Sequence, residues 1–124
     1  MRCLIVDDNE PFLEIASASL ARDGLQVIGT ARTSAEALRQ VERLRPDVVL
    51  VDVNLGGENG FELARQLVEM FPELRSGVVL ISTRDEDDYG SLLTASPAVG
   101  FVRKTHLSAK AIRDAVSVPD LSDP

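Results

Sequence analysis

The sequence predicts an α/β domain built on a doubly wound, five-stranded parallel sheet. Short apolar runs alternate along the chain with segments whose apolar residues recur at helical spacing. The runs are apolar at consecutive positions, which is typical of strands that helices cover on both faces. The length of 124 residues suits one domain. Right-handed crossovers then favour the doubly wound arrangement.

Five strands are expected, one at each short apolar run. They span residues 3–6, 25–30, 48–51, 78–81 and 99–102. A segment with helical periodicity follows each run, so the order of elements is (βα)5. In a sheet of this kind, ligands bind beyond the carboxyl ends of the strands.

The first two helices have clear start and stop signals. Asn9 and Pro11 begin the first helix, because proline is well tolerated in the first turn, and Asp23-Gly24 close it. Ser34 is expected to cap the second helix, and Pro46 ends it.

The last three helices differ in the strength of their signals. Residues 61–71 carry a regular apolar stripe that stops before Pro72. A weaker helix is expected over residues 86–95, interrupted by Gly90, and Ser108 caps the last helix. We expect a domain at residues 1–118 and a C-terminal tail or the start of a linker at 119–124.

The composition narrows the classes of function. The net charge of −7 argues against direct binding to nucleic acid, which needs clustered lysine and arginine. Cys3 is the one cysteine and is expected to be buried as a small apolar residue. The chain shows no secretory signal and no apolar run near the ~18 residues of a membrane span. We therefore expect a cytoplasmic protein that does not act at membranes.

Polar side chains follow four of the expected strands. They are Asp7 and Asp8, Asp52, Ser82 and Lys104. If the strands are parallel, these groups meet at one edge of the sheet. Carboxylates this close repel one another unless a cation intervenes, and Mg²⁺ fits better than Ca²⁺ because it needs fewer protein oxygens.

A magnesium site with open positions suits phosphoryl chemistry. A carboxylate such as Asp52 can attack phosphorus and form an aspartyl phosphate. The transferred group then needs its equatorial oxygens neutralised, for which Mg²⁺, Lys104 and Ser82 are candidates. The glycines at 56 and 57 leave room for that group behind Asp52.

The sequence resembles the receiver domains of two-component response regulators over essentially its whole length. The residues that carry this resemblance are LIVDD (4–8), VVLVDVNLGGENG (48–60), VVLIST (78–83) and GFVRK (100–104). Each motif stands at the end of an expected strand, and all occur in the family's order. The resemblance implies the flavodoxin-like topology with strand order 2-1-3-4-5.

The resemblance also implies roles for individual residues. Asp52 would accept a phosphoryl group from a sensor histidine kinase, as in phosphorelay signalling, and Lys104 would pair with it. For Mg²⁺, the implied ligands are Asp8, Asp52 and the backbone carbonyl of Asn54, with Asp7 acting mainly through water. The chain would catalyse only its own phosphorylation and autodephosphorylation.

The implied switch residues are Ser82, Thr83 and Phe101. Ser82 would move toward the phosphoryl group, and Phe101 would change rotamer with it. Thr83 stands where a smaller residue is usual, which suggests a slower loss of the phosphoryl group. Thr105 replaces the usual proline after Lys104, so we expect a trans peptide bond there.

The expected output face consists of the fourth helix, the fifth strand and the fifth helix. This face would control a partner protein or an output domain, or would form a homodimer. The chain is either a stand-alone receiver or part of a longer regulator with a helix-turn-helix domain. We expect the motion at the weak fourth helix, because it has few apolar anchors.

Three other functions are open to the same residue pattern. A phosphatase of the haloacid dehalogenase class needs an aspartate at the position of Asn54, and a flavin carrier needs a Ser/Thr/Gly-rich loop after the first strand. A degenerate receiver would bind partners without being phosphorylated.

Two other features are expected to have no role in the site. His106 is expected in a solvated loop and not as a phosphodonor. The acidic run at 85–88 is expected as an exposed helix start.

Overall fold

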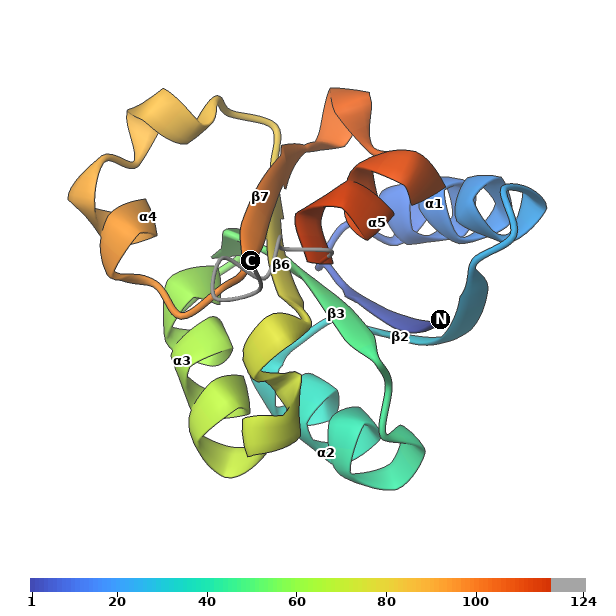
Figure 1. Cartoon of the computed structure of the whole chain (residues 1–124), viewed down its shortest axis with the longest axis horizontal. Helices are drawn as coiled ribbons and strands as arrows, with labels where there is room; N and C mark the ends of the chain where they lie inside the picture. The colour runs from blue at the N-terminus through green and yellow to red at the C-terminus, as the bar shows by residue number, and fades with distance from the viewer. Residues whose placement is uncertain (117–124) are drawn as a thin grey trace, which may run out of the picture.

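The structure is a computed structural model that describes residues 1–116. The expected tail at 119–124 and the end of the expected domain, at 117–118, lie outside the described residues. Within residues 1–116, helices pack on both faces of a central sheet (Figure 1). No helix in this part of the chain has the length and apolar character to cross a bilayer.

The central sheet has five parallel strands in the order β2-β1-β3-β6-β7. Their bounds are β1 (Arg2–Val6), β2 (Gln26–Ala31), β3 (Val48–Asp52), β6 (Val78–Ser82) and β7 (Gly100–Arg103). Counted along the chain, this order is 2-1-3-4-5. The predicted fold class and the five predicted strands are therefore confirmed, with ends that shift by one residue.

Two apolar cores lie on opposite faces of the sheet. Helices α1 (Glu10–Arg22) and α5 (Ala109–Val116) pack on one face, and α2 (Ser34–Leu44) and α3 (Gly60–Met70) pack on the other (Figure 1). The strands β3 and β6 are buried at every residue because they contribute to both cores. Cys3 is fully buried, as predicted.

Most helix ends follow the predicted signals. The Asn9 side chain accepts a hydrogen bond from the Phe12 N–H and caps α1, and Gly24 has φ +96° just after the helix. The Ser108 hydroxyl accepts from the Ala111 N–H at 3.0 Å at the start of α5.

The predicted cap of α2 was wrong by one residue. Thr33, not Ser34, is the N-cap: it has an extended backbone, and its side chain accepts from the Glu36 N–H at 3.1 Å. Ser34 is the first helical residue. The two adjacent hydroxyl residues offer the same capping chemistry, so only the backbone conformation separates them. The helix ends at Leu44, and Arg45 takes a left-handed conformation before Pro46.

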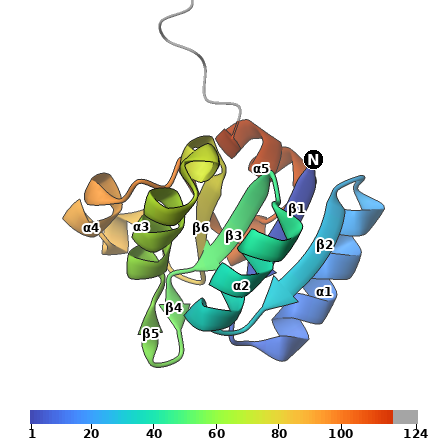
Figure 2. The same ribbon diagram turned by 90° about the horizontal axis from the view of Figure 1, so that it is seen from below.

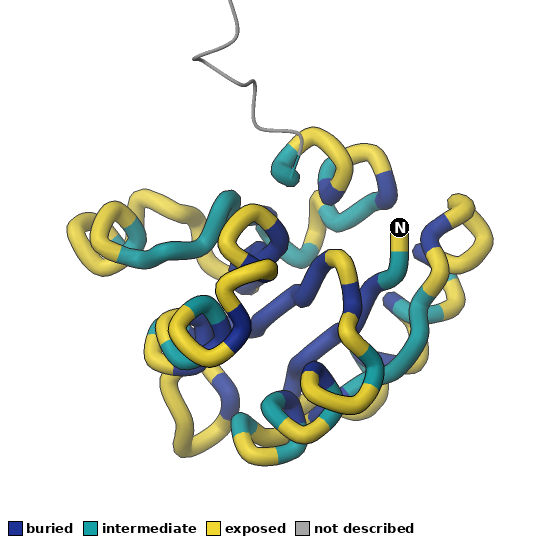
Figure 3. The backbone as a smooth tube through the Cα atoms, turned by 60° about the horizontal axis from the view of Figure 1, so that its bottom comes forward, coloured by how far each residue is buried: buried dark blue, intermediate teal, exposed yellow. Residues whose placement is uncertain are grey.

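The predicted weak helix at 86–95 is shorter than expected. It divides into the 3-10 helix η2 (Glu86–Asp88) and the five-residue helix α4 (Ser91–Ala95). Gly90 separates them with φ +52°, a conformation that ends helical geometry, so the predicted interruption is confirmed. Figure 3 shows this segment as exposed and half-buried chain beside the buried strands.

Four short elements were not predicted. The strands β4 (Asn54–Leu55) and β5 (Glu58–Asn59) form a hairpin that projects beyond the carboxyl end of β3 (Figure 2). Gly56 has φ +66° in its turn, which suits glycine. The 3-10 helices η1 (Pro72–Ser76) and η3 (Lys104–His106) follow α3 and β7.

Candidate functional site

The register of the parallel strands determines which side chains meet at the carboxyl edge. Val6 pairs with Val51, so the next residues of the two strands, Asp7 and Asp52, lie side by side. On the other side of β3, Ser82 pairs with Arg103, which brings Lys104 to the same edge. Four strand ends therefore supply one site.

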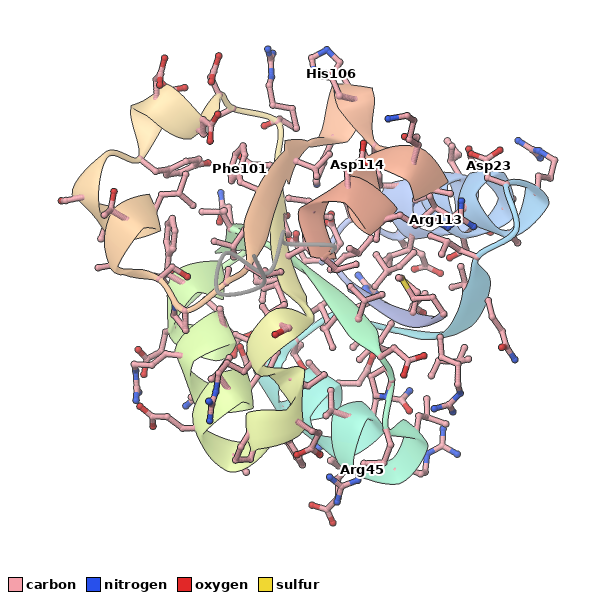
Figure 4. The ribbon with its side chains drawn as sticks, in the orientation of Figure 1. Asp23, Arg45, Phe101, His106, Arg113 and Asp114 are labelled. Atoms are coloured by element: carbon pink, nitrogen blue, oxygen red, sulfur yellow. The ribbon has the colours of Figure 1, made fainter. Side chains whose placement is uncertain are left out.

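These side chains line a pocket of about 310 Å³. The residues singled out from the sequence that line it are Asp7, Asp8, Asp52, Asn54, Ser82, Thr83 and Lys104. Phe101 on β7 is half-buried and packs against the core on the α2 and α3 face of the sheet. It lies beside the segment that carries η2 and α4 (Figure 4). The structure thus brings the predicted acidic, hydroxyl and amine groups together and leaves the predicted aromatic switch outside the pocket.

Lys104 links two of the carboxylates. Its Nζ lies 2.6 Å from Asp7 Oδ2 and 3.4 Å from Asp52 Oδ2. The same ammonium lies 4.4 Å from the centroid of the Phe12 ring, within range of a cation–π interaction. Phe12 was not predicted as part of the site, and its place in the apolar stripe of α1 gives no sign of this contact. Together these contacts hold the lysine over the pocket.

Asp7 and Asp8 have different environments. Asp7 is fully buried, and its Oδ1 accepts from the Asn9 N–H at 2.9 Å while its Oδ2 faces Lys104. The Asp8 side chain is exposed. A Cβ atom on Gly56 would lie 3.1 Å from Asp8 Oδ2, so the glycine leaves space around that carboxylate. Asp8 is therefore better placed than Asp7 to bind a cation directly.

The three aspartates form a cluster that can hold a metal ion. One oxygen from each of Asp7, Asp8 and Asp52 lies within 4.8 Å of the others. Carboxylate oxygens are the ligands that hard divalent cations prefer, and Mg²⁺ often takes only one or two of them. The residues present fit a Mg²⁺ site that keeps positions open for other ligands.

The electrostatic environment of Asp52 also favours a bound cation. Burial, followed by the negative charge of Asp7, raises the pKa of the Asp52 carboxyl to about 6, against the opposing effect of Lys104. The ammonium therefore does not fully offset the combined effect of burial and of the Asp7 charge on Asp52. A bound cation would supply the missing positive charge and favour the ionised form of Asp52.

Glycine explains how α3 can begin so close to this site. A Cβ atom on Gly60 would collide with the backbone carbonyl of Asp52. The Gly60 N–H also donates to the Val53 carbonyl at 2.8 Å. The absence of a side chain at position 60 lets the first turn of α3 pack directly against the chain that carries Asp52.

Tyr89, like Phe12, is a residue at the site that was not predicted from the sequence. Its Oη lies 2.6 Å from Ser82 Oγ in a hydrogen bond, and its side chain lines the pocket. A lone tyrosine after an exposed acidic run was the available signal. The Lys104–Thr105 bond is trans, as predicted. His106 is exposed and points away from the molecule, also as predicted (Figure 4).

The fold and this acidic edge are those implied by the resemblance to response regulators. A family model described as a response regulator receiver domain matches residues 3–117, so the chain belongs to this family. The response regulator GacA of Pseudomonas viridiflava is 36% identical over 105 residues, which are 84% of this chain and 48% of that protein. The transcriptional activator DevR/DosR of Mycobacterium tuberculosis is 35% identical over 118 residues, 92% of this chain and 54% of that protein.

Solved structures show the same architecture. The receiver domain of the putative regulator NarL from Mycobacterium tuberculosis matches with a TM-score of 0.78 at 31% identity, covering 93% of this chain and 94% of that one. The response regulator domain of Thermotoga maritima CheB shares the fold, with a TM-score of 0.78 at 24% identity over 95% of this chain and 97% of that one. The chain spans about half the length of the curated relatives named above.

Proposed function

We propose that this receiver domain accepts a phosphoryl group on Asp52 from a histidine kinase and thereby changes the face formed by α4, β7 and α5. The position of the Asp52 carboxylate supports this most directly. It is 6% exposed, opens into the polar pocket, and has an ammonium 3.4 Å away. A buried carboxylate with this access has the surroundings of a nucleophile.

The reaction is a phosphoryl transfer between side chains. An oxygen of Asp52 forms a bond to phosphorus while the bond from phosphorus to the donor imidazole nitrogen breaks, and the electron pair leaves with that nitrogen. Lys104 offsets the negative charge of the group on Asp52. Water later attacks the aspartyl phosphate, so the domain catalyses its own phosphorylation and dephosphorylation and acts on no separate substrate.

Mg²⁺ is the cofactor that the acidic cluster fits. Asp8, Asp52 and the Asn54 carbonyl would hold it, with Asp7 acting through water, because one Asp7 oxygen accepts a hydrogen bond from Asn9 and the other is ion-paired with Lys104. When bound, the ion supplies positive charge beside the acceptor carboxylate and the phosphoryl oxygens. Asp7 in turn orients Lys104 toward the pocket.

The acceptor role is tested by intact mass after incubation with phosphoramidate and Mg²⁺. The wild-type chain should gain one phosphoryl group, and Asp52→Asn should gain none. Asp23→Asn is the matched control, because Asp23 is an exposed carboxylate at the far end of α1 (Figure 4), and it should behave as wild type. A folded wild-type chain that gains no mass with Mg²⁺ would instead indicate a degenerate receiver.

Thr83 is proposed to slow the loss of the phosphoryl group. It is an exposed residue at the pocket, and its methyl and hydroxyl groups stand where they can obstruct an attacking water. Thr83→Ala should therefore lose the phosphoryl group faster than wild type, by about tenfold if the obstruction costs about 1.4 kcal/mol. Equal decay rates in a phosphate-release assay would rule out this role.

The output partner is proposed from the relatives. DevR/DosR is described as a DNA-binding transcriptional activator, and DegU of Brevibacillus brevis, 29% identical over 95% of this chain and 49% of its own length, as a transcriptional regulatory protein. We therefore propose that the face of α4, β7 and α5 contacts an output domain or partner of that kind, or a second copy of this chain. The receiver itself is not expected to contact DNA.

A further inference from the structure

The hydroxyl of Ser82 has two hydrogen-bond partners in the segment that follows it. Ser82 Oγ accepts from the Arg84 N–H at 3.0 Å and shares a 2.6 Å hydrogen bond with Tyr89 Oη. Ser82 is 4% exposed, so this pair is shielded from most of the solvent. Tyr89 thus reaches from the end of η2 back to the edge of the sheet.

The ring of Tyr89 is held between two other aromatic rings. It lies 5.5 Å from the ring of Phe61 on α3, edge to face, and 5.8 Å from the ring of Phe101 on β7. Its backbone carbonyl accepts from the Leu92 N–H at 3.0 Å, in the first turn of α4. One residue therefore connects Ser82 to α3, β7 and the start of α4.

The hydrogen-bonding capacity of these groups allows two arrangements. A serine hydroxyl has one proton and two lone pairs, and the Arg84 N–H occupies one lone pair. In the first arrangement Ser82 donates its proton to Tyr89. In the second Tyr89 donates to the remaining lone pair of Ser82, and the Ser82 proton is then available to another acceptor.

We propose that Tyr89 is a positioning residue that sets the direction of the Ser82 hydroxyl and thereby transmits the state of Asp52 to residues 84–98. This inference rests on the proposed phosphorylation of Asp52. A phosphoryl oxygen is a strong, charged acceptor, so it selects the arrangement in which Tyr89 donates to Ser82 and Ser82 donates to the phosphoryl group. Successive hydrogen bonds of this kind strengthen one another.

This assignment differs from the role that the family resemblance gives to Phe101. Phe101 has no hydroxyl and lies outside the pocket, whereas Tyr89 has a hydroxyl on Ser82 and a ring against Phe101. Phe101 then serves as a wall for the Tyr89 ring. Motion of Ser82 toward the phosphoryl group displaces Tyr89 and, through it, the first turn of α4.

The segment that Tyr89 connects is poorly anchored by other contacts. All residues of η2 and four of the five residues of α4 are exposed, and Leu93 is half-buried. A small change in the position of one anchor is enough to shift the population of conformations in such a segment.

The test is hydrogen exchange at the amides of residues 84–98, with and without phosphoramidate and Mg²⁺, in wild type and Tyr89→Phe. This variant removes one oxygen and keeps the ring. In wild type, phosphorylation should change the exchange rates there by about fivefold, as expected for one hydrogen bond, and in Tyr89→Phe by less than about twofold. Intact mass gives the phosphorylated fraction of each protein, and the exchange rates are compared at equal phosphorylated fractions.

Two further variants separate this role from a structural one. Phe101→Leu should keep most of the wild-type response, because the Tyr89–Ser82 hydrogen bond remains. Ser82→Ala should lose the response, and adding Tyr89→Phe to it should change nothing more, since both act on one hydrogen bond.

The inference is overturned if phosphorylated Tyr89→Phe responds as wild type does, if Phe101→Leu alone abolishes the response, or if a folded Tyr89→Phe gains no mass. Absence of a mass gain in the wild-type protein would instead contradict the proposed acceptor function.

Discussion

The helices α3 and α4, which follow the site strands β3 and β6 along the chain, differ in how firmly they are held. Helix α3 has 11 residues, begins with an Asn59 cap and buries Leu63, Ala64 and Leu67 against the sheet. Helix α4 has five residues, and Leu92 in it is 57% exposed. If Asp52 is phosphorylated as proposed, we expect α4 to move more readily than α3, because local unfolding of α4 costs less free energy.

The largest expected effect is on the stability of the protein when α3 is altered. Leu67 is fully buried in the middle of α3, and Leu67→Ala should lower the free energy of unfolding by about 3 kcal/mol through lost burial and the cavity left behind. Urea denaturation followed by circular dichroism measures this change. A loss below about 1 kcal/mol would show that α3 is not the anchor that its burial indicates.

The next effect concerns the packing of α3 against the end of β3. Gly60→Ala should destabilise the protein by about 2 kcal/mol, because its Cβ would collide with the Asp52 carbonyl. Gly57→Ala is the matched control: a Cβ at position 57 meets no atom within 4 Å, and the change should stay within about 0.5 kcal/mol. Equal thermal shifts for the two variants would contradict the close approach at Gly60.

A smaller effect of opposite sign is expected at Asp52. The raised pKa of Asp52, about 6, means that the native state holds this proton more tightly than the unfolded chain does. The contribution of Asp52 to stability is therefore greatest below about pH 4 and is lost as the pH rises to about 6. Asparagine cannot ionise, so Asp52→Asn avoids the cost of a buried negative charge at neutral pH. At pH 7 without Mg²⁺ this variant should be more stable than wild type by about 1 kcal/mol, allowing for solvent screening at the pocket mouth.

Thermal denaturation of both proteins between pH 4 and pH 8 measures this effect. The difference between them should grow up to about pH 6 and then level off. Mg²⁺ should raise the melting temperature of wild type more than that of Asp52→Asn. A difference that does not change with pH would contradict the raised pKa.

The smallest effect on stability is expected when α4 is altered. Leu92→Ala should change the free energy of unfolding by less than about 0.5 kcal/mol, because its side chain is mostly in solvent. The same denaturation experiment as for Leu67→Ala makes α3 and α4 directly comparable. If Leu92→Ala lowers the free energy of unfolding as much as Leu67→Ala does, the two helices are anchored equally firmly.

Sequence reasoning predicted the parts of the fold that rest on repeated patterns. Each parallel strand is a continuous apolar run, and the long helices carry regular stripes with caps at their ends, so many residues support each assignment. The hairpin of β4 and β5 was not predictable in this way. Each of its strands has two residues, too few to show a period, and the Gly56-Gly57 pair marks a turn without indicating strands on either side.

The candidate site was predictable where it lies directly after strands. Asp7, Asp52 and Ser82 each end or follow a strand, and parallel pairing alone brings them together. Tyr89 and Phe12 could not be found this way. Tyr89 meets Ser82 because the chain turns back after η2, and Phe12 meets Lys104 because the lysine side chain reaches from the end of β7 to the start of α1. Neither approach follows from the pattern of strand ends.

The close approach at Gly60 has a consequence for where the domain can move. The first turn of α3 packs against the carbonyl of Asp52 with no side chain between them. If Asp52 accepts a phosphoryl group as proposed, its backbone cannot shift toward α3, so we expect the displacement on the Ser82 and Tyr89 side of the pocket.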